Sequence, residues 1–514
     1  MKPIRLMSGF FTVGVWTLLS RVLGFLREVM ILSLIGPGPL MDAFVAAFRL
    51  PNMFRRFFAE GAFNAAFVPM FSKRLEGEDG AGEFAQNAFA GLFFVVTVLT
   101  ALGMVFMPAL VWLTAEGFSG DGRFGLTVDY GRIAFPYILF MSLSALFSGI
   151  LNATGRFAVA AAAPVLLNIF VIAALSIAAL TNSPAINWLI WAIPVAGAAQ
   201  LALTWNAAAK AGFKLRLARP RWNADMRDLV VIALPAALAS GVMQINLVVG
   251  QLVASQFENA VSWLFAADRL YQLPLGVVGI AVGVVLLPDL SRRLRAGDDE
   301  GAKGALSRAA EISLALTIPS AVALIVIPLT LVSVLFERGA SGTDDSAAIA
   351  TAVMIYGLGL PAFVLQKIVQ PLYFAREDTR RPFYFAIVAM VLNAALAVGL
   401  APYVEWLAPA IAATVAGWAM YGMLAIGARR FGDTARVDDR FRRRIWRIMA
   451  ASLIMGAVVW FANLQMSPLL TLPWWRGLGL VVLIVIAAVT YFGSGQWIGA
   501  FKLSEFKAAM RRGR

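Results

Sequence analysis

Cysteine and histidine are both absent from this sequence of 514 residues. Without them the chain has no disulfide bonds, no thiolate nucleophiles and almost no possible zinc sites. The absence of histidine also removes the side chain that most often acts as a general base near neutral pH. We therefore expect neither a metal site nor a cofactor, and we expect a protein that is not an enzyme.

Charged residues are also scarce, at 14% of the sequence, whereas hydrophobic residues make up 60%. A soluble globular protein has about 45–50% apolar and about 25% charged residues. Runs of about 20 apolar residues, which match the thickness of a bilayer, recur along the whole chain. Fourteen such runs predict an all-α polytopic membrane protein with fourteen transmembrane helices. Five prolines lie inside the runs, so several helices are predicted to be kinked: Pro51, Pro108, Pro136, Pro319 and Pro361.

Lysine and arginine are distributed unequally between alternate loops. If the N-terminus is placed in the cytoplasm, 32 of the 43 basic residues fall on the inner side and four on the outer side. The four outer residues are Arg123, Arg132, Arg338 and Arg476. Because cytoplasmic loops are enriched in Lys and Arg, both termini are predicted to be cytoplasmic. The same rule accounts for the net charge of +14 without a nucleic-acid partner.

An internal repeat relates the two halves of the chain. Pro136 and Asn168 match Pro361 and Asn393 at an offset of 225 residues, and PMFSKRL at 69–75 matches PDLSRRL at 288–294. The repeat predicts two six-helix lobes in the same orientation, related by an axis along the membrane normal and facing each other across a transporter-like cleft. The predicted parts are an N-terminal lobe (1–215), a C-terminal lobe (216–430) and an appended helix pair with a tail (431–514).

Eleven charged residues lie inside the predicted spans. The bases are Arg21, Arg27, Arg49, Arg55, Arg56, Arg269 and Lys367, and the acids are Glu28, Asp42, Glu60 and Asp268. A charged side chain at the bilayer centre costs roughly 2.5–3.5 kcal/mol on insertion scales. These side chains must therefore face protein or water, and seven bases against four acids leave an excess of positive charge.

Helical geometry separates these charges into two groups. At about 100° per residue, Asp42, Arg49, Arg56 and Glu60 share one stripe, and Arg21 shares a face with Glu28. We interpret the stripe as structural pairing. Arg55 points away from it, and Arg27 has Glu28 only as a sequence neighbour, so these two arginines are candidates for binding an anion.

Two other observations favour an anion site, although simpler explanations remain open. The segment LGVVGIAVGVV, which matches the second span in the other half, carries no charge, so the arginines belong to one lobe, with Arg269 added from span eight. Guanidinium groups suit phosphate oxygens, and no P-loop indicates ATP binding. Snorkelling of Arg27 and Arg49, or arginines that merely tie helices together, are the alternatives.

Several motifs resemble those of the bacterial MurJ/MviN lipid II flippases, which belong to the multidrug/oligosaccharidyl-lipid/polysaccharide exporter superfamily. The motifs are SRVLGFLRE (20–28), DAF (42–44), RLPNMFRRFFAEGAFNAAFVP (49–69), FPYI (135–138) and ADRL (267–270). The resemblance implies a V-shaped pair of lobes, with a C-terminal helix pair forming a groove for a polyprenyl tail. It also implies a monomer in the bacterial inner membrane.

The resemblance further implies a function and its residues. It implies that the chain moves lipid II, an undecaprenyl-pyrophosphoryl disaccharide-pentapeptide, from the cytoplasmic to the periplasmic leaflet by alternating access, for peptidoglycan synthesis. The essential arginines of the family fall on Arg21, Arg27, Arg55 and Arg269, and its important acids fall on Asp42 and Glu60. Glu28 stands where the family often has Asp, and Arg49, Arg56 and Asp268 are expected to support the site.

The energy source and the partners stay open. Some family members have a sodium site in spans seven and eleven, where this chain offers Gln244, Asn246 and Asn393 but no carboxylate. A coupling ion is therefore doubtful, and the membrane potential is the alternative. Besides lipid II and the bilayer, the peptidoglycan synthesis machinery is an expected partner. Rival functions are a flippase for another polyprenyl-linked glycan, a multidrug/cation antiporter, a scaffold for wall-synthesis enzymes, and a channel.

Overall fold

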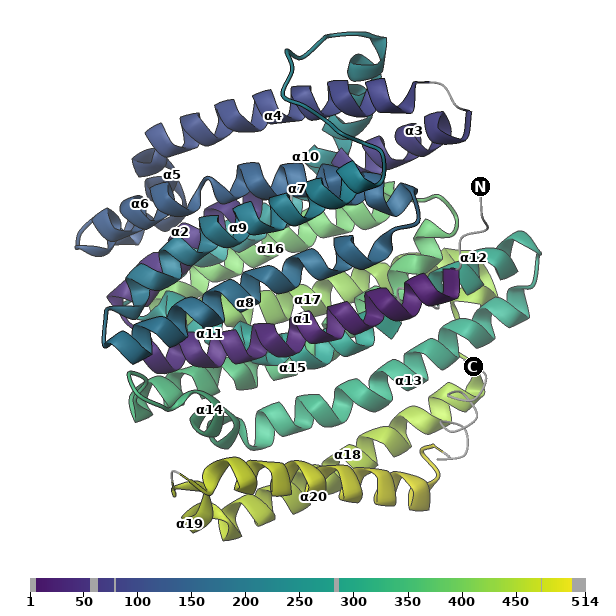
Figure 1. The fold of residues 1–514 in the computed structure, drawn as a ribbon. Helices are drawn as coiled ribbons and strands as arrows, with labels where there is room; N and C mark the ends of the chain where they lie inside the picture. The colour runs from purple at the N-terminus through teal and green to yellow at the C-terminus, as the bar shows by residue number, and fades with distance from the viewer. Residues whose placement is uncertain (1–5, 56–62, 78–79, 282–285, 473, 502–514) are drawn as a thin grey trace. The chain divides into compact units, whose positions relative to one another are not determined.

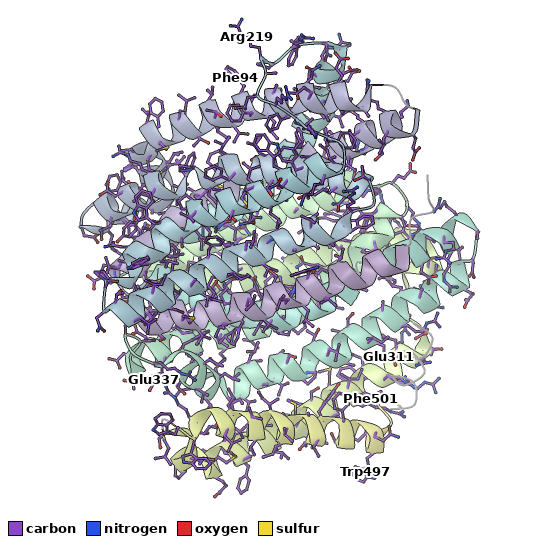
Figure 2. The ribbon with its side chains drawn as sticks, viewed as in Figure 1. Phe94, Arg219, Glu311, Glu337, Trp497 and Phe501 are labelled. Carbon is purple, nitrogen blue, oxygen red and sulfur yellow. The ribbon has the colours of Figure 1, made fainter. Side chains whose placement is uncertain are left out.

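The computed structural model describes residues 6–55, 63–77, 80–281, 286–472 and 474–501. This part of the chain consists of helices and short connections and contains no β-strand (Figure 1). Within it, nine helical segments are long and apolar enough to cross a membrane. Large apolar side chains such as Phe94 on α4 are exposed, as expected for a surface that faces lipid (Figure 2). The prediction of an all-α polytopic membrane protein is confirmed.

The chain forms two compact units, Met1–Ser262 and Trp263–Arg514, and each is described here by itself. The first unit contains α1 (Leu6–Leu34), α2 (Pro39–Arg55), α3 (Phe63–Gly77), α4 (Ala81–Val105), α5 (Met107–Ala115), η2 (Glu116–Phe118), α6 (Arg123–Ala134), α7 (Tyr137–Ala153), α8 (Phe157–Thr181), α9 (Ala185–Lys210), α10 (Ala224–Ala254) and the first turn of α11 (Ala260–Ala281).

The second unit contains the rest of α11 and the helices that follow it. These are α12 (Leu287–Arg295), α13 (Asp299–Val326), α14 (Pro328–Phe336), α15 (Thr343–Phe374), α16 (Arg380–Val404), η4 (Glu405–Leu407), α17 (Ala408–Ala428), η5 (Arg429–Ala435), α18 (Asp439–Gln465), α19 (Ser467–Leu470) and α20 (Arg476–Ile498). Figure 1 shows α14 and α19 near one end of this unit and α12 near the other.

Two of the five prolines inside the predicted spans interrupt helices, whereas Pro51, Pro319 and Pro361 lie within α2, α13 and α15, which continue through them. The break between α4 and α5 falls at Phe106, with Pro108 in the first turn of α5, and Pro136 separates α6 from α7. Proline lacks the N–H of a helical hydrogen bond and clashes with the preceding turn, so a helix tends to end or bend there. If α2 and α3, α4 and α5, α6 and α7, α11 and α12, and α13 and α14 are each counted as one crossing, and the four-residue α19 is left out, the described α-helices form fourteen crossings.

Aromatic rings fill the core of the first unit. The ring of Phe67 on α3 stacks on Phe71 and on Phe84 of α4, with centroids 5.4 and 5.6 Å apart. Phe89 on α4 contacts Phe147 on α7 with centroids 5.5 Å apart. These rings belong to one hydrophobic cluster that joins α3, α4 and α7.

The sequence repeat reappears in how the helices pack inside each unit. In the first unit α9 packs against both α7 and α8, and in the second unit α17 packs against both α15 and α16. The matched residues Asn168 on α8 and Asn393 on α16 are each 5% exposed. The two units therefore contain the same three-helix arrangement, as the offset of 225 residues predicts.

The first compact unit ends at Ser262, which is 47 residues beyond the lobe boundary predicted at residue 215. This difference arises because α10 packs against α3 and α5 of the first unit. The compact units describe how the helices pack. The division of the repeated sequence at residue 215 stays a prediction.

The C-terminal helices α18 and α20 pack on α13 within the second unit. The hydroxyl of Tyr491 on α20 donates to the Ala315 carbonyl oxygen of α13 at 2.5 Å. Glu311 on α13, labelled in Figure 2, is 7% exposed and forms ion pairs with Arg440 and Arg444 of α18. The apolar run centred near residue 322 begins after Glu311, so hydropathy alone placed this carboxylate outside the spans.

Substituting Glu311 with alanine is expected to loosen α18 from α13. The change removes a buried carboxylate and leaves the guanidinium of Arg444, whose side chain is 13% exposed, without it. We expect a loss of about 2 kcal/mol or more of stability, measured by thermal unfolding in detergent. Asp433→Ala is the matched control, because the Asp433 side chain is 69% exposed in its pair with Arg436. Equal melting temperatures for the two variants would show that the ion pairs of Glu311 do not hold α18 against α13.

Candidate functional site

Arg27 is anchored where α1 packs against α8. Its Nη1 donates to Asn168 Oδ1 at 2.9 Å, and its Nη2 donates to Glu28 Oε1 at 2.5 Å. Asn168 Nδ2 in turn donates to the carbonyl oxygen of Ser20 at 2.9 Å. Gly24 lies beside this contact, where an added Cβ would meet the Asn168 amide at an ordinary contact distance of 3.7 Å. A guanidinium held by two partners keeps one orientation, while its side chain stays 16% exposed.

The pairing of Glu28 corrects one expectation. From helical angles, Glu28 was expected to share a face with Arg21 and not to face Arg27. In the structure Glu28 is paired with Arg27. Adjacent Cβ atoms on a helix diverge by about 100°, but the side chains of Arg and Glu are long enough to curve towards each other. Arg21 is exposed, and no hydrogen bond joins it to another described residue.

Arg49 and Arg55 both lie on α2. Arg55 is the last described residue of α2 and is partly buried. Arg49, one turn and a half earlier, donates Nη1 to the carbonyl oxygen of Leu247 on α10 at 3.3 Å. Arg56 and Glu60 lie outside the described residues, so the predicted pair between them stays a prediction.

Asp42 is completely buried and is bound by groups from outside α2. Its Oδ2 accepts from Arg123 Nη1 at 3.2 Å, and its Oδ1 accepts from the backbone N–H of Ser262 at 2.9 Å and from the Ser262 hydroxyl. The Ser262 N–H belongs to the first turn of α11, where backbone donors have no partner within the helix. A carboxylate at this position is also favoured by the positive end of the helix dipole.

Arg123 connects this carboxylate to the loop before α6. Arg123 Nε donates to Asp121 Oδ2 at 2.8 Å, and Nη1 donates to the Phe257 carbonyl oxygen at 3.3 Å. The Arg123 guanidinium, by its hydrogen bond, holds the pKa of Asp121 below the ordinary value. The guanidinium also lies over the ring of Phe118, 4.4 Å from its centroid.

This network corrects the assignment of Asp42 to a stripe that it shares with Arg49. The partner of Asp42 is Arg123, which hydropathy had placed among the outer-loop arginines. The two residues are 81 positions apart in the sequence, so no local spacing connects them. One sequence feature draws attention to Arg123. It is one of four arginines assigned to the predicted outer loops, and it follows Asp121 by two positions.

In the second unit, Arg269 lies on α11 and is partly buried. Its guanidinium stacks over the ring of Phe265, with the carbon atom 4.4 Å from the centroid. The neighbouring carboxylate of Asp268 accepts a hydrogen bond from Gln272. Stacking of this kind orients the plane of the guanidinium.

Taken residue by residue, these groups are suited to binding an anion and not to catalysis. The described residues contain no group of three or more acids that is placed to hold a metal ion. The arginines supply fixed positive charge. Two of the candidate acids, Glu28 and Asp42, form ion pairs with Arg27 and Arg123. Planar guanidinium groups bind phosphate oxygens through paired N–H bonds.

Comparisons with known proteins identify the family. The sequence model of the family described as "Lipid II flippase MurJ" matches residues 31–486. The chain is 42% identical to the "Probable lipid II flippase MurJ" of Rhizobium tropici, over 99% of this chain and 98% of that protein.

Solved structures have the same fold. A structure described as "Lipid II flippase MurJ, inward closed conformation" matches with a TM-score of 0.79 and 23% identity, over 94% of this chain and 98% of that one. An inward-facing MATE-family multidrug transporter matches with a TM-score of 0.66 and 16% identity, over 84% of this chain and 96% of that one. Since the family match spans most of the sequence, this chain belongs to the lipid II flippase MurJ family.

Proposed function

We propose that this chain moves lipid II from the cytoplasmic to the outer leaflet of the bacterial inner membrane by alternating access. In this proposal Arg21, Arg27, Arg55 and Arg269 bind the pyrophosphate of the headgroup. Family membership supports the substrate, and the partial burial of Arg27, Arg55 and Arg269 supports their role. Burying charge in apolar helices is costly, so each arginine requires either a structural or a functional reason.

The arrangement around Arg27 carries the proposal. Each terminal nitrogen of the Arg27 guanidinium carries two N–H groups, and the bonds to Asn168 and Glu28 use one on each, so further N–H groups remain for an anion, while the side chain is 16% exposed. Asn168 and Glu28 hold these two nitrogens and thereby set the direction of the guanidinium. Glu28 also balances the charge of Arg27 until an anion arrives, which is a supporting role and not a binding one.

The remaining assignments complete the proposal. Asp42, Arg49, Arg56, Glu60 and Asp268 support the site, both termini lie in the cytoplasm, and the chain acts as a monomer in contact with the bilayer. The positive-inside pattern supports this orientation. The peptidoglycan synthesis machinery is the proposed protein partner.

The decisive experiment is a leaflet-accessibility assay for lipid II. Bacteria depleted of their own flippase are complemented with this chain, and the lipid II exposed on the outer leaflet is measured by its reaction with an impermeant reagent. We expect complementation to restore outward lipid II to the level before depletion. No restoration, despite normal insertion of the protein in the membrane, would overturn the proposal.

A second arm of the assay tests which polyprenyl-linked headgroup is transported. Vesicles containing the purified chain receive either lipid II or a polyprenyl-pyrophosphate linked to an unrelated glycan. Both molecules share the pyrophosphate, so a preference for lipid II would come from contacts with its sugar and peptide. Equal transfer of both lipids would contradict a dedicated lipid II flippase.

Substituting Asn168 with alanine is expected to weaken transport without unfolding the protein. The change removes the acceptor that orients Arg27 and leaves the Arg27–Glu28 ion pair in place. One hydrogen bond to a charged group contributes about 1.5–3 kcal/mol, so we expect at least about a tenfold loss of headgroup affinity. The matched control is Asn393→Ala, the repeat counterpart with the same exposure. Equal affinities for the two variants would show that Asn168 does not position Arg27.

A further inference from the structure

Arginine is rare at one side of this protein, and two of the four arginines predicted there lie together. Arg123 is neutralised by Asp42 and Asp121. Arg338 and Arg476, both in the second unit, are close enough for the charge of one to affect the other. Within the described part of the chain no salt bridge joins either of them to a carboxylate; Glu337, labelled in Figure 2, directly precedes Arg338. Neighbouring like charges repel, so an anion that reaches this pair is favoured.

The two guanidinium groups come from elements that contact each other. Arg338 follows α14, and its Nη2 donates to the carbonyl oxygen of Val334 in the last turn of that helix at 2.9 Å. Arg476 is the first residue of α20, which contacts α14. Desolvation and the charge of Arg476 lower the pKa of Arg338 below its ordinary value. The Nε atom of Arg476 is buried and has no hydrogen-bond partner among the described residues.

Ser341 lies three residues after Arg338, and its backbone N–H donates to the Arg338 carbonyl oxygen at 3.2 Å. Ser341 is 4% exposed, and its buried hydroxyl has no partner in the described residues. At the start of α20 the N–H groups of Arg476 and Gly479 donate to the carbonyl oxygens of Leu472 and Trp475, so this helix contributes chiefly the positive end of its dipole. Two guanidinium groups at the positive end of a helix favour binding of a phosphate group.

The surrounding side chains indicate that the anion belongs to a lipid. Trp474 and Trp475 immediately precede α20 and are 94% and 52% exposed, and Leu472 is 49% exposed. Exposed tryptophans next to a transmembrane helix are typical of the membrane–water interface, at the depth of lipid headgroups. A phosphate bound by Arg338 and Arg476 at this depth would leave its acyl chains beside the apolar surface of α20, where Val481 and Ile484 are exposed.

We propose that Arg338 and Arg476 bind the phosphate of an anionic glycerophospholipid at the adjoining ends of α14 and α20. The bound lipid neutralises the arginine pair and fastens α20 to the rest of the second unit. This site is separate from the proposed pyrophosphate site and does not depend on lipid II transfer. The same guanidinium pair would also accept free inorganic phosphate, so the test has to separate the two sources.

The test measures lipid binding to the full-length purified protein by native mass spectrometry. Phosphatidylglycerol and zwitterionic phosphatidylcholine are titrated separately into the wild type, Arg338→Gln, Arg476→Gln and the double variant. We expect the double variant to bind phosphatidylglycerol at least about tenfold more weakly, while phosphatidylcholine binding stays unchanged. Arg132→Gln is the matched control, since Arg132 is exposed on the first unit and donates to the Met104 carbonyl oxygen.

Two further arms make the outcome decisive. Arg338→Lys with Arg476→Lys keeps the charge, and this variant should bind phosphatidylglycerol more tightly than the glutamine pair, even if the latter folds poorly. Addition of inorganic phosphate should not displace phosphatidylglycerol from the wild type, because the lipid is also held by its acyl chains. Undiminished lipid binding in folded glutamine variants, or complete displacement by phosphate, would overturn the proposal.

Discussion

Replacing Arg27 with alanine is expected to reduce lipid II transfer by about a hundredfold or more and to abolish complementation. The reason is that Arg27 alone among the candidate arginines of α1 is fixed by two partners, Asn168 and Glu28. If its guanidinium makes two charge-assisted hydrogen bonds to the pyrophosphate, each contributes about 1.5–3 kcal/mol. Losing about 3 kcal/mol corresponds to about two powers of ten in affinity.

Two variants separate binding from folding in this experiment. Arg27→Lys keeps a positive charge but loses the fork that contacts two partners, so partial activity is expected. Arg132→Ala removes an exposed arginine of the same unit and should transfer lipid II at the wild-type rate. The assay follows headgroup transfer in vesicles, with insertion checked by protease protection. Normal transfer by a well-folded Arg27→Ala protein would remove Arg27 from the pyrophosphate site.

Replacing Arg123 with glutamine is expected to give the largest loss of stability. The change leaves the Asp42 carboxylate, which is fully buried, with Ser262 as its remaining described partner and without a counter-charge. Removing one partner of a buried ion pair costs about 3–5 kcal/mol, because the other charge stays buried and uncompensated. Thermal unfolding of the purified protein in detergent measures this effect, and Arg132→Gln again serves as the control.

A double-mutant cycle tests whether the cost comes from the stranded carboxylate. Asp42→Asn removes the buried charge, so adding it to Arg123→Gln should raise the melting temperature above that of Arg123→Gln alone. The coupling between the two sites is expected to be about 1–3 kcal/mol. Strictly additive effects would mean that Asp42 and Arg123 stabilise the protein independently, contrary to the 3.2 Å contact between them.

Side-chain reach and chain topology explain which parts of the site could be predicted. The candidate status of Arg27 followed from its position in an apolar run, and the importance of Asn168 was visible as a match to Asn393 in the repeat. The contact between Arg27 and Asn168 joins residues 141 positions apart, so helical spacing within one span contains no information about it. Helical angles also misled, since they describe Cβ directions and not the ends of long flexible side chains such as Arg27 and Glu28.

The sequence by itself determined the membrane class, the number of crossings, the charge bias between the two sides and the family. Lipid excludes unsatisfied backbone groups and charge, so composition and the length of apolar runs are enough to predict helices that span it. Only the tertiary structure decided which charge neutralises which. Arg123 pairs with Asp42, Arg27 with Glu28 and Asn168, and Glu311 with Arg440 and Arg444. Such pairings depend on which helices pack together, and a hydropathy pattern that is nearly the same for every span does not specify that.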